Sequence, residues 1–129
     1  MPDTLRVLYV DDEADIRAIV EFALEDEDDF EIAVCASGPE ALARVADYRP
    51  DLILLDVMMP GMDGPGTLRA LRQQAGFEKT PVAFMTAKVQ PREVAALKAM
   101  GATGVIAKPF DPMTLADQIR TLYREDGHG

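Results

Sequence analysis

Cysteine and long apolar runs are nearly absent from this chain. Its one cysteine, Cys35, has no partner for an internal disulfide, and its apolar neighbours predict a buried structural thiol. No apolar run is long enough to span a membrane, and no basic leader with an apolar segment precedes Asp3 in the manner of a signal peptide. These absences argue against a disulfide-stapled, secreted or membrane-spanning protein, and we expect a cytoplasmic one.

Positive charge is also scarce. The chain has 13 lysines and arginines against 23 aspartates and glutamates, which gives a formal net charge of −10 and a pI near 4.4. A surface with this balance repels the phosphates of nucleic acid and of anionic lipid. We therefore expect no direct contact with nucleic acid and no membrane association.

The apolar content is sufficient for one compact domain. The length of 129 residues and the hydrophobic fraction of 48% are ordinary for a single globular domain. We place that domain at residues 1–125. Residues 126–129 have no periodic pattern, and we expect them to form a disordered tail.

Strand-like and helix-like segments alternate along the chain. The expected strands are residues 5–10, 31–36, 52–55, 81–85 and 105–107. A helix is expected after each strand: at 14–25, after the capping pair Ser37 and Glu40, from Pro65, from Pro91 to Gly101, and after Asp111 and Pro112. Because parallel strands need crossover helices, the pattern predicts an α/β fold with a five-stranded parallel sheet and five helices on both faces.

The apolar spacing also predicts which helix faces are buried. In the first helix Ile19 and Val20 belong to the expected inner face, and in the fourth helix Leu97 and Met100 do so.

Three carboxylates follow two of the expected strands. Asp11 and Asp12 come directly after the apolar run 7–10, and Asp56 comes after 52–55. In open parallel sheets the ligand site lies beyond the carboxyl ends of the strands, and Thr86 and Lys108 end two further strands at the same edge. Two unit charges about 4 Å apart in a partly shielded site repel by roughly 4 kcal/mol, so the carboxylates need a cation or a proton between them. The cluster predicts a divalent metal and a reactive carboxylate.

Four motifs at these strand ends resemble those of the receiver domains of two-component response regulators. They are Val10-Asp11-Asp12-Glu13, the run from Leu55 to Gly64 around Asp56, Met85-Thr86-Ala87, and Lys108-Pro109-Phe110. The resemblance extends from Leu5 to about Arg124 and implies the CheY-like, flavodoxin-type fold with strand order 2-1-3-4-5. It also implies a cis bond before Pro109, and it suggests a stand-alone, single-domain response regulator.

The same resemblance implies that Asp56 accepts a phosphoryl group from a sensor histidine kinase or a histidine phosphotransfer protein, with Mg²⁺ as cofactor. Lys108 would neutralise one phosphoryl oxygen, and Thr86 would donate its hydroxyl to another. Such a domain is not an enzyme, although it assists its own phosphotransfer and autodephosphorylation. The implied metal ligands are Asp12 and Asp56 directly, Asp11 through water, and the backbone carbonyl of Met58.

The surface expected to contact a downstream protein departs from the family pattern. The acyl phosphate would switch a contact with a downstream protein, or be passed on, through the surface of the fourth helix, fifth strand and fifth helix, in a monomer or a phosphorylation-dependent homodimer. Val105 stands where such domains carry an aromatic side chain that rotates on phosphorylation. We therefore expect switching to rely on the loop after the fourth strand, including Lys88, or on the fourth helix. The sole histidine, His128, lies in the tail and is not expected to carry phosphate.

Plainer interpretations stay open for single residues. Asp11 could cap the first helix, Thr86 could be only a strand residue, and Lys108 could be an exposed solubilising lysine. The main alternative function is a phosphorylation-independent interaction module on the same fold. A flavodoxin is disfavoured because the acidic pair would repel its anionic cofactor, and a haloacid-dehalogenase-type phosphatase because Asp56-Val57-Met58 lacks a second acid.

Overall fold

The computed structural model describes residues 4–127, which form a single sheet with helices on both sides. The strands are β1 (Leu5–Val10), β2 (Phe30–Cys35), β3 (Leu52–Asp56), β4 (Val82–Thr86) and β5 (Gly104–Ala107). The helices are α1 (Ala14–Glu25), α2 (Gly38–Tyr48), α3 (Gly64–Arg72), α4 (Pro91–Ala99) and α5 (Leu115–Glu125). All neighbouring strands are parallel, in the order β2-β1-β3-β4-β5. The predicted α/β fold and its strand order are confirmed.

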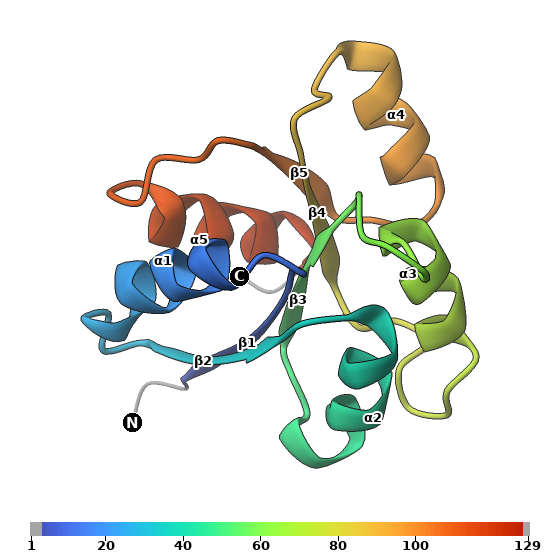
Figure 1. The fold of residues 1–129 in the computed structure, drawn as a ribbon, viewed down its shortest axis with the longest axis horizontal. Helices are drawn as coiled ribbons and strands as arrows, with labels where there is room; N and C mark the ends of the chain where they lie inside the picture. The colour runs from blue at the N-terminus through green and yellow to red at the C-terminus, as the bar shows by residue number, and fades with distance from the viewer. Residues whose placement is uncertain (1–3, 128–129) are drawn as a thin grey trace.

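The sheet separates two apolar cores (Figure 1). Helices α1 and α5 cover one face, and α2, α3 and α4 cover the other. Successive side chains of β1 alternate between the cores: Tyr9 packs on the α1/α5 side, while Leu8 and Val10 pack on the opposite side. Because both faces are covered, every residue of β3 and β4 is buried. This explains why the sequence shows continuous apolar runs there instead of alternation.

Side-chain caps fix the starts of two helices beside the sheet edge. The Ser37 hydroxyl accepts a hydrogen bond from the Glu40 amide at 3.2 Å at the start of α2, as the sequence predicted. The Asp63 carboxylate accepts one from the Gly66 amide at 2.8 Å at the start of α3. Gly64 follows that cap directly, and a Cβ at this position would lie 2.5 Å from the Asp56 carbonyl oxygen. The glycine therefore allows the start of α3 to approach the end of β3 closely.

Two details of the helices differ from the sequence-based expectation. Helix α5 begins at Leu115, because the Asp111 carboxylate accepts a hydrogen bond from the Met113 amide at 2.9 Å and caps a separate turn. Ile19 and Met100 are 41% and 45% exposed, so both were wrongly assigned to the core. In α1 the fully buried positions are Val20 and Leu24, and in α4 only Leu97 is buried.

Cys35 is buried at the end of β2, as predicted, and burial raises the pKa of its thiol to about 11.

In the segment predicted as a tail, the Asp126 carboxylate accepts a hydrogen bond from the Thr103 hydroxyl at 2.6 Å. Residues 128 and 129, including His128, lie outside the described residues. Across residues 4–127, every helix is too short or too polar to cross a bilayer.

Arg120 of α5 ties that helix to the acidic connection between α1 and β2. Its guanidinium makes two hydrogen bonds to the Asp29 carboxylate, at 2.8 and 2.9 Å, and a third to Glu27 at 2.5 Å. It also lies 4.9 Å from the centre of the Phe30 ring. The hydrogen bonds from Arg120 hold the pKa of Asp29 below its ordinary value. The acidic segment 25–29, which joins α1 to β2, is therefore partly neutralised in the fold.

Replacing Arg120 by methionine is expected to lower the free energy of unfolding by about 1 kcal/mol at neutral pH, because the ion pairs are partly exposed and screened. Since the pKa of Asp29 is depressed in the folded state, its contribution is present above the ordinary aspartate pKa and disappears as the pH falls through the folded value. Urea unfolding at neutral and acidic pH measures this. The matched control is Arg124→Met, at an exposed position of the same helix. An equal loss in both variants, or a loss that persists in acid, would contradict the assignment.

Candidate metal centre and reactive carboxylate

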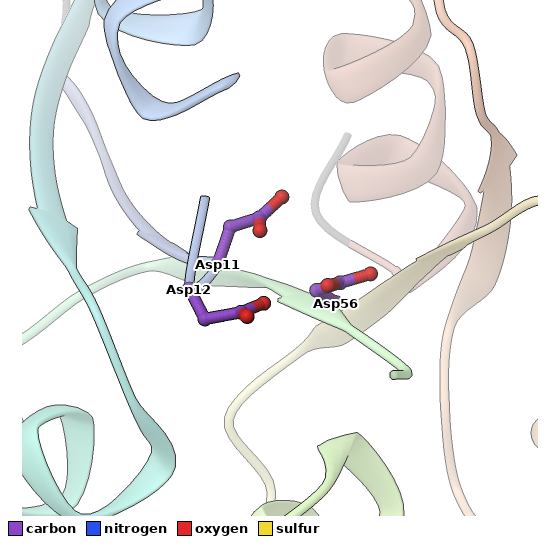
Figure 2. A group of neighbouring side chains, drawn as sticks. All are labelled: Asp11, Asp12 and Asp56. Carbon is purple, nitrogen blue, oxygen red and sulfur yellow. The ribbon is translucent and has the colours of Figure 1, made fainter. Parts of the chain in front are cut away.

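Three carboxylates meet where β1 and β3 end side by side. Val10 pairs with Leu55 in the sheet, so the residues that follow these two strands emerge at the same edge. Figure 2 shows Asp11, Asp12 and Asp56 gathered there. One oxygen from each lies within 4.8 Å of the others, and this group could hold a metal ion. Asp11 and Asp56 are 0% and 4% exposed, whereas Asp12 is open to solvent.

Lys108 provides a positive charge inside this group. Its ammonium lies 3.0 Å from the Asp11 carboxylate and 3.2 Å from the Asp56 carboxylate. The Lys108 amide donates to the Thr86 carbonyl at 2.9 Å, which fixes the end of β5 against β4. The following bond to Pro109 is cis, as the resemblance implied. Lys108 is therefore a partly buried ion-pair residue and not an exposed solubilising lysine.

The electrostatics follow from two buried carboxylates sharing one lysine. Burial, followed by repulsion from Asp11, raises the pKa of Asp56 above its ordinary value, although Lys108 opposes the shift. Burial lowers the pKa of Lys108, but the hydrogen bond and charge of Asp11, together with the charge of Asp56, outweigh it and leave that pKa raised. Lys108 therefore keeps its positive charge, and this charge only partly neutralises the negative charge of ionised Asp56. A divalent cation would relieve this imbalance.

Asp11 has more hydrogen-bond partners than its neighbours in the cluster. Its Oδ2 accepts from the Tyr9 hydroxyl at 2.6 Å and from Lys108, and its Oδ1 accepts from the Glu13 amide at 3.0 Å. Glu13 is the N-cap residue of α1, so Asp11 contacts the residue before that helix but is not itself its cap. Arg17 of α1 donates to the Asp11 carbonyl at 2.7 Å. Asp11 is thus held from both its side chain and its backbone.

Thr86 and Met58 occupy the same edge with other orientations. Thr86 ends β4, is 4% exposed, and its hydroxyl accepts a hydrogen bond from the Lys88 amide at 3.0 Å. Met58 lies two residues beyond Asp56, and its side chain is 69% exposed. The structure therefore brings the three acids and Lys108 together. Thr86 lies at the same sheet edge, but its hydroxyl is bonded to the Lys88 amide in the loop after β4.

Tyr9 and Arg17 were not among the predicted site residues. Tyr9 precedes Asp11 by two residues, and side chains two apart along an extended chain point to the same face. That spacing, together with a hydroxyl within the apolar run 7–10, was the available signal for Tyr9. Arg17 lies one helical turn from the start of α1, and nothing in the local sequence indicates that it reaches back to a carbonyl.

Comparison with known proteins agrees with this geometry. The profile described as "Response regulator receiver domain" matches residues 7–120. The chain belongs to the response regulator receiver family. As a receiver, it is a module of two-component signal transduction, in which phosphorylation of an aspartate is the family mechanism, and it is not a conventional enzyme.

Several receivers are similar over nearly all of this chain. The "DNA-binding response regulator MtrA" of Mycobacterium tuberculosis is 38% identical over 126 residues, which is 96% of this chain and 54% of that protein. The "Response regulator Rre1" of Synechocystis sp. is 35% identical over 95% of this chain and 53% of that protein. The chain therefore spans about half the length of these curated relatives.

Solved structures give the same result for the fold. The chemotaxis response regulator CheY4 of Vibrio cholerae has a TM-score of 0.85 and 38% identity, covering 92% of this chain and 98% of that one. A putative response regulator from Chloroflexus aurantiacus has a TM-score of 0.83 at 29% identity, covering 95% of this chain and 99% of that one. The receiver fold with its five parallel strands is thus shared over the whole described domain.

Proposed function

We propose that Asp56 is the phosphoacceptor of this receiver and takes a phosphoryl group from a histidine kinase or a histidine phosphotransfer protein. The observation that carries the proposal is the buried Asp56 carboxylate, within 4.8 Å of two further acids and paired at 3.2 Å with Lys108. Phosphoryl transfer depends mainly on positioning and on neutralising charge at the phosphoryl oxygens. A carboxylate between a lysine and a cation site meets both requirements.

Mg²⁺ is the cofactor we propose for the acidic group. The proposed donors are the Asp12 and Asp56 carboxylates and the Met58 carbonyl, with Asp11 acting through water, and the three carboxylates are grouped closely enough to hold an ion. Hard oxygen donors of this kind suit Mg²⁺, which retains waters and accepts phosphate ligands. When bound, the ion would neutralise charge on the phosphoryl oxygens. Among the described residues, Lys108 is the only cationic side chain within bonding distance of the buried Asp11 and Asp56 carboxylates, so the acids are in excess.

The chain's own residues would act around one displacement step. An oxygen of the Asp56 carboxylate forms a bond to phosphorus while the bond from phosphorus to the donor's histidine nitrogen breaks, and that nitrogen then takes up a proton. The Lys108 ammonium would shift towards a phosphoryl oxygen. Thr86 exchanges its hydrogen bond with the Lys88 amide for donation to another phosphoryl oxygen. Autodephosphorylation reverses the modification: water attacks the phosphorus, and the Asp56 carboxylate leaves.

The output surface we propose consists of α4, β5 and α5. An open groove of about 370 Å³ lies between β5 and α5, lined in part by Val105, Thr114 and Leu122. Met100, the C-cap of α4, is exposed, and Leu97 is the only buried residue of that helix. A helix held by so few buried side chains can shift readily when the loop containing Lys88 moves. A downstream protein, or a second phosphorylated copy of this chain, would bind there.

Direct DNA binding is not part of the proposed function of this segment. MtrA is named for DNA binding, but it is about twice as long as the part that this chain matches. The net charge of −10 disfavours contact with a phosphate backbone. The alternative, an interaction module that works without phosphorylation, predicts no chemistry at Asp56.

Incubation with acetyl phosphate and Mg²⁺, followed by intact mass measurement, tests the proposal. We expect a single phosphoryl group on the wild-type protein, located by peptide mapping on the fragment that contains Asp56. Chelation of Mg²⁺ with EDTA should prevent the addition. Modification at another carboxylate would exclude Asp56 as the phosphoacceptor, and no modification at any Mg²⁺ concentration would favour the interaction module.

A further inference from the structure

The hydroxyl of Tyr9 reaches the carboxylate site from the core on the α1/α5 side of the sheet. Its ring is fully buried in the core between the sheet and helices α1 and α5, surrounded by aliphatic side chains such as Val20 and Leu54. Its hydroxyl reaches the Asp11 carboxylate at 2.6 Å, and Asp11 is fully buried as well. A buried tyrosine hydroxyl needs a partner, and this one is an anion that belongs to the candidate metal site.

The bond from Tyr9 restricts how the Asp11 carboxylate can turn. A carboxylate has about four acceptor positions on its two oxygens. In this site Oδ2 accepts from Tyr9 and Lys108, and Oδ1 accepts from the Glu13 amide. Three directions are therefore filled by donors from three different elements, and the acceptor capacity that remains is on Oδ1. If Lys108 moves to a phosphoryl group, Tyr9 is the donor that stays on Oδ2.

The phenol can act only as a donor here. A carboxylate can only accept hydrogen bonds, so the Tyr9 hydroxyl is the donor in the 2.6 Å bond to Asp11. Phenylalanine would fill the same core volume without this bond. The hydroxyl therefore contributes to the site separately from the packing of the ring.

We propose that Tyr9 is a positioning residue for the metal site: its hydroxyl orients the Asp11 carboxylate so that Oδ1 faces the cation, and it thereby sets the affinity of the site for Mg²⁺. This rests on the Mg²⁺ site proposed above. Partners behind a metal-binding group orient it and typically change metal affinity by about 10- to 100-fold when they are removed. The bond from the Tyr9 hydroxyl to Asp11 is such a partner.

Titration calorimetry with Mg²⁺ alone, on unphosphorylated protein at neutral pH, tests the role of Tyr9. We expect Tyr9→Phe to bind Mg²⁺ about tenfold more weakly than wild type. The matched control is Tyr48→Phe, which removes another buried hydroxyl, one that donates to the Glu31 carbonyl at 3.1 Å on the other face of the sheet. Tyr48→Phe should bind Mg²⁺ as wild type does. Unchanged or tighter binding by Tyr9→Phe overturns the positioning role alone, and wild-type protein that binds no Mg²⁺ overturns the metal site with it.

A second measurement separates positioning from a general effect on folding. In phosphorylation by acetyl phosphate, the Mg²⁺ concentration that gives half the maximal rate should rise about tenfold in Tyr9→Phe, a larger change than in the maximal rate itself. A merely structural role would lower the maximal rate, or the folded fraction, and leave the half-saturating concentration in place. That pattern would also overturn the proposal.

Discussion

Asp56→Asn is expected to abolish phosphorylation by acetyl phosphate and, in the absence of Mg²⁺, to make the folded protein more stable. The amide cannot form the acyl phosphate, so the mass increase seen in wild type should be absent. The gain in stability follows from the site, where two buried carboxylates share one ammonium and the pKa of Asp56 is raised by burial and by Asp11. A neutral side chain at this position removes the repulsion between Asp56 and Asp11, and Lys108 then pairs with Asp11 alone.

The size of that gain can be bounded from the charges. Two unit charges about 4 to 5 Å apart in a partly shielded site repel by roughly 3 to 4 kcal/mol, and Lys108 offsets much of this. We expect Asp56→Asn to raise the free energy of unfolding in EDTA by about 1 to 2 kcal/mol, and the difference to shrink in acid, where wild-type Asp56 takes up a proton in the folded state. Asp47→Asn, at an exposed position of α2, is the control and should keep both phosphorylation and stability. Phosphorylated Asp56→Asn protein, or a variant less stable than wild type, would refute this account.

Lys108→Met is expected to have the opposite effect on stability. Removing the ammonium leaves the Asp11 and Asp56 carboxylates buried without their shared cation. Breaking a buried pair by removing one partner commonly costs about 3 to 5 kcal/mol, and because Lys108 retains some exposure we expect a loss of about 2 to 4 kcal/mol in EDTA at neutral pH. Methionine keeps most of the length of the side chain, so the loss reports charge more than packing.

Mg²⁺ should stabilise the Lys108→Met protein more than it stabilises wild type. A site with an additional uncompensated negative charge attracts the cation more strongly, and a ligand at about 100 times its dissociation constant adds about 2.7 kcal/mol. Urea unfolding in EDTA and in saturating Mg²⁺ gives both quantities. Lys79→Met, at an exposed position, is the control for the loss of one positive charge from the surface. If Lys108→Met matched Lys79→Met in EDTA, or if Mg²⁺ stabilised it no more than wild type, the shared-cation description would be wrong.

The strands themselves were predictable because their signals are local and strong. Val7 to Val10, Leu52 to Leu55 and Val82 to Met85 are buried on both faces, so their apolar runs are unbroken and mark central parallel strands. The acids after such runs had to meet at one sheet edge, and Asp11, Asp12 and Asp56 do. The strand order itself came from the family resemblance, because local patterns do not specify which strands become neighbours.

The errors arose where local signals have more than one structural outcome. The Asp111-Pro112 pair has the chemistry of a helix start, but it caps a turn, and α5 begins only at Leu115. Ile19 is next to the buried Val20, and Met100 lies three residues beyond the buried Leu97. Periodicity cannot resolve which of several nearby apolar residues faces the core. In both cases the packing of the helix against the sheet makes the choice.

The alternation of strands and helices, the two cores, and the residue types that collect at the carboxyl edge follow from local sequence patterns, because burial and strand ends depend on residues close together along the chain. Three contacts depend instead on the folded structure: one ammonium serves both Asp11 and Asp56, Arg120 neutralises part of the acidic segment between α1 and β2, and Tyr9 donates to Asp11 from within the core. Hydrogen bonds and ion pairs act over about 3 Å, so they depend on side-chain positions that exist only once distant segments have packed together.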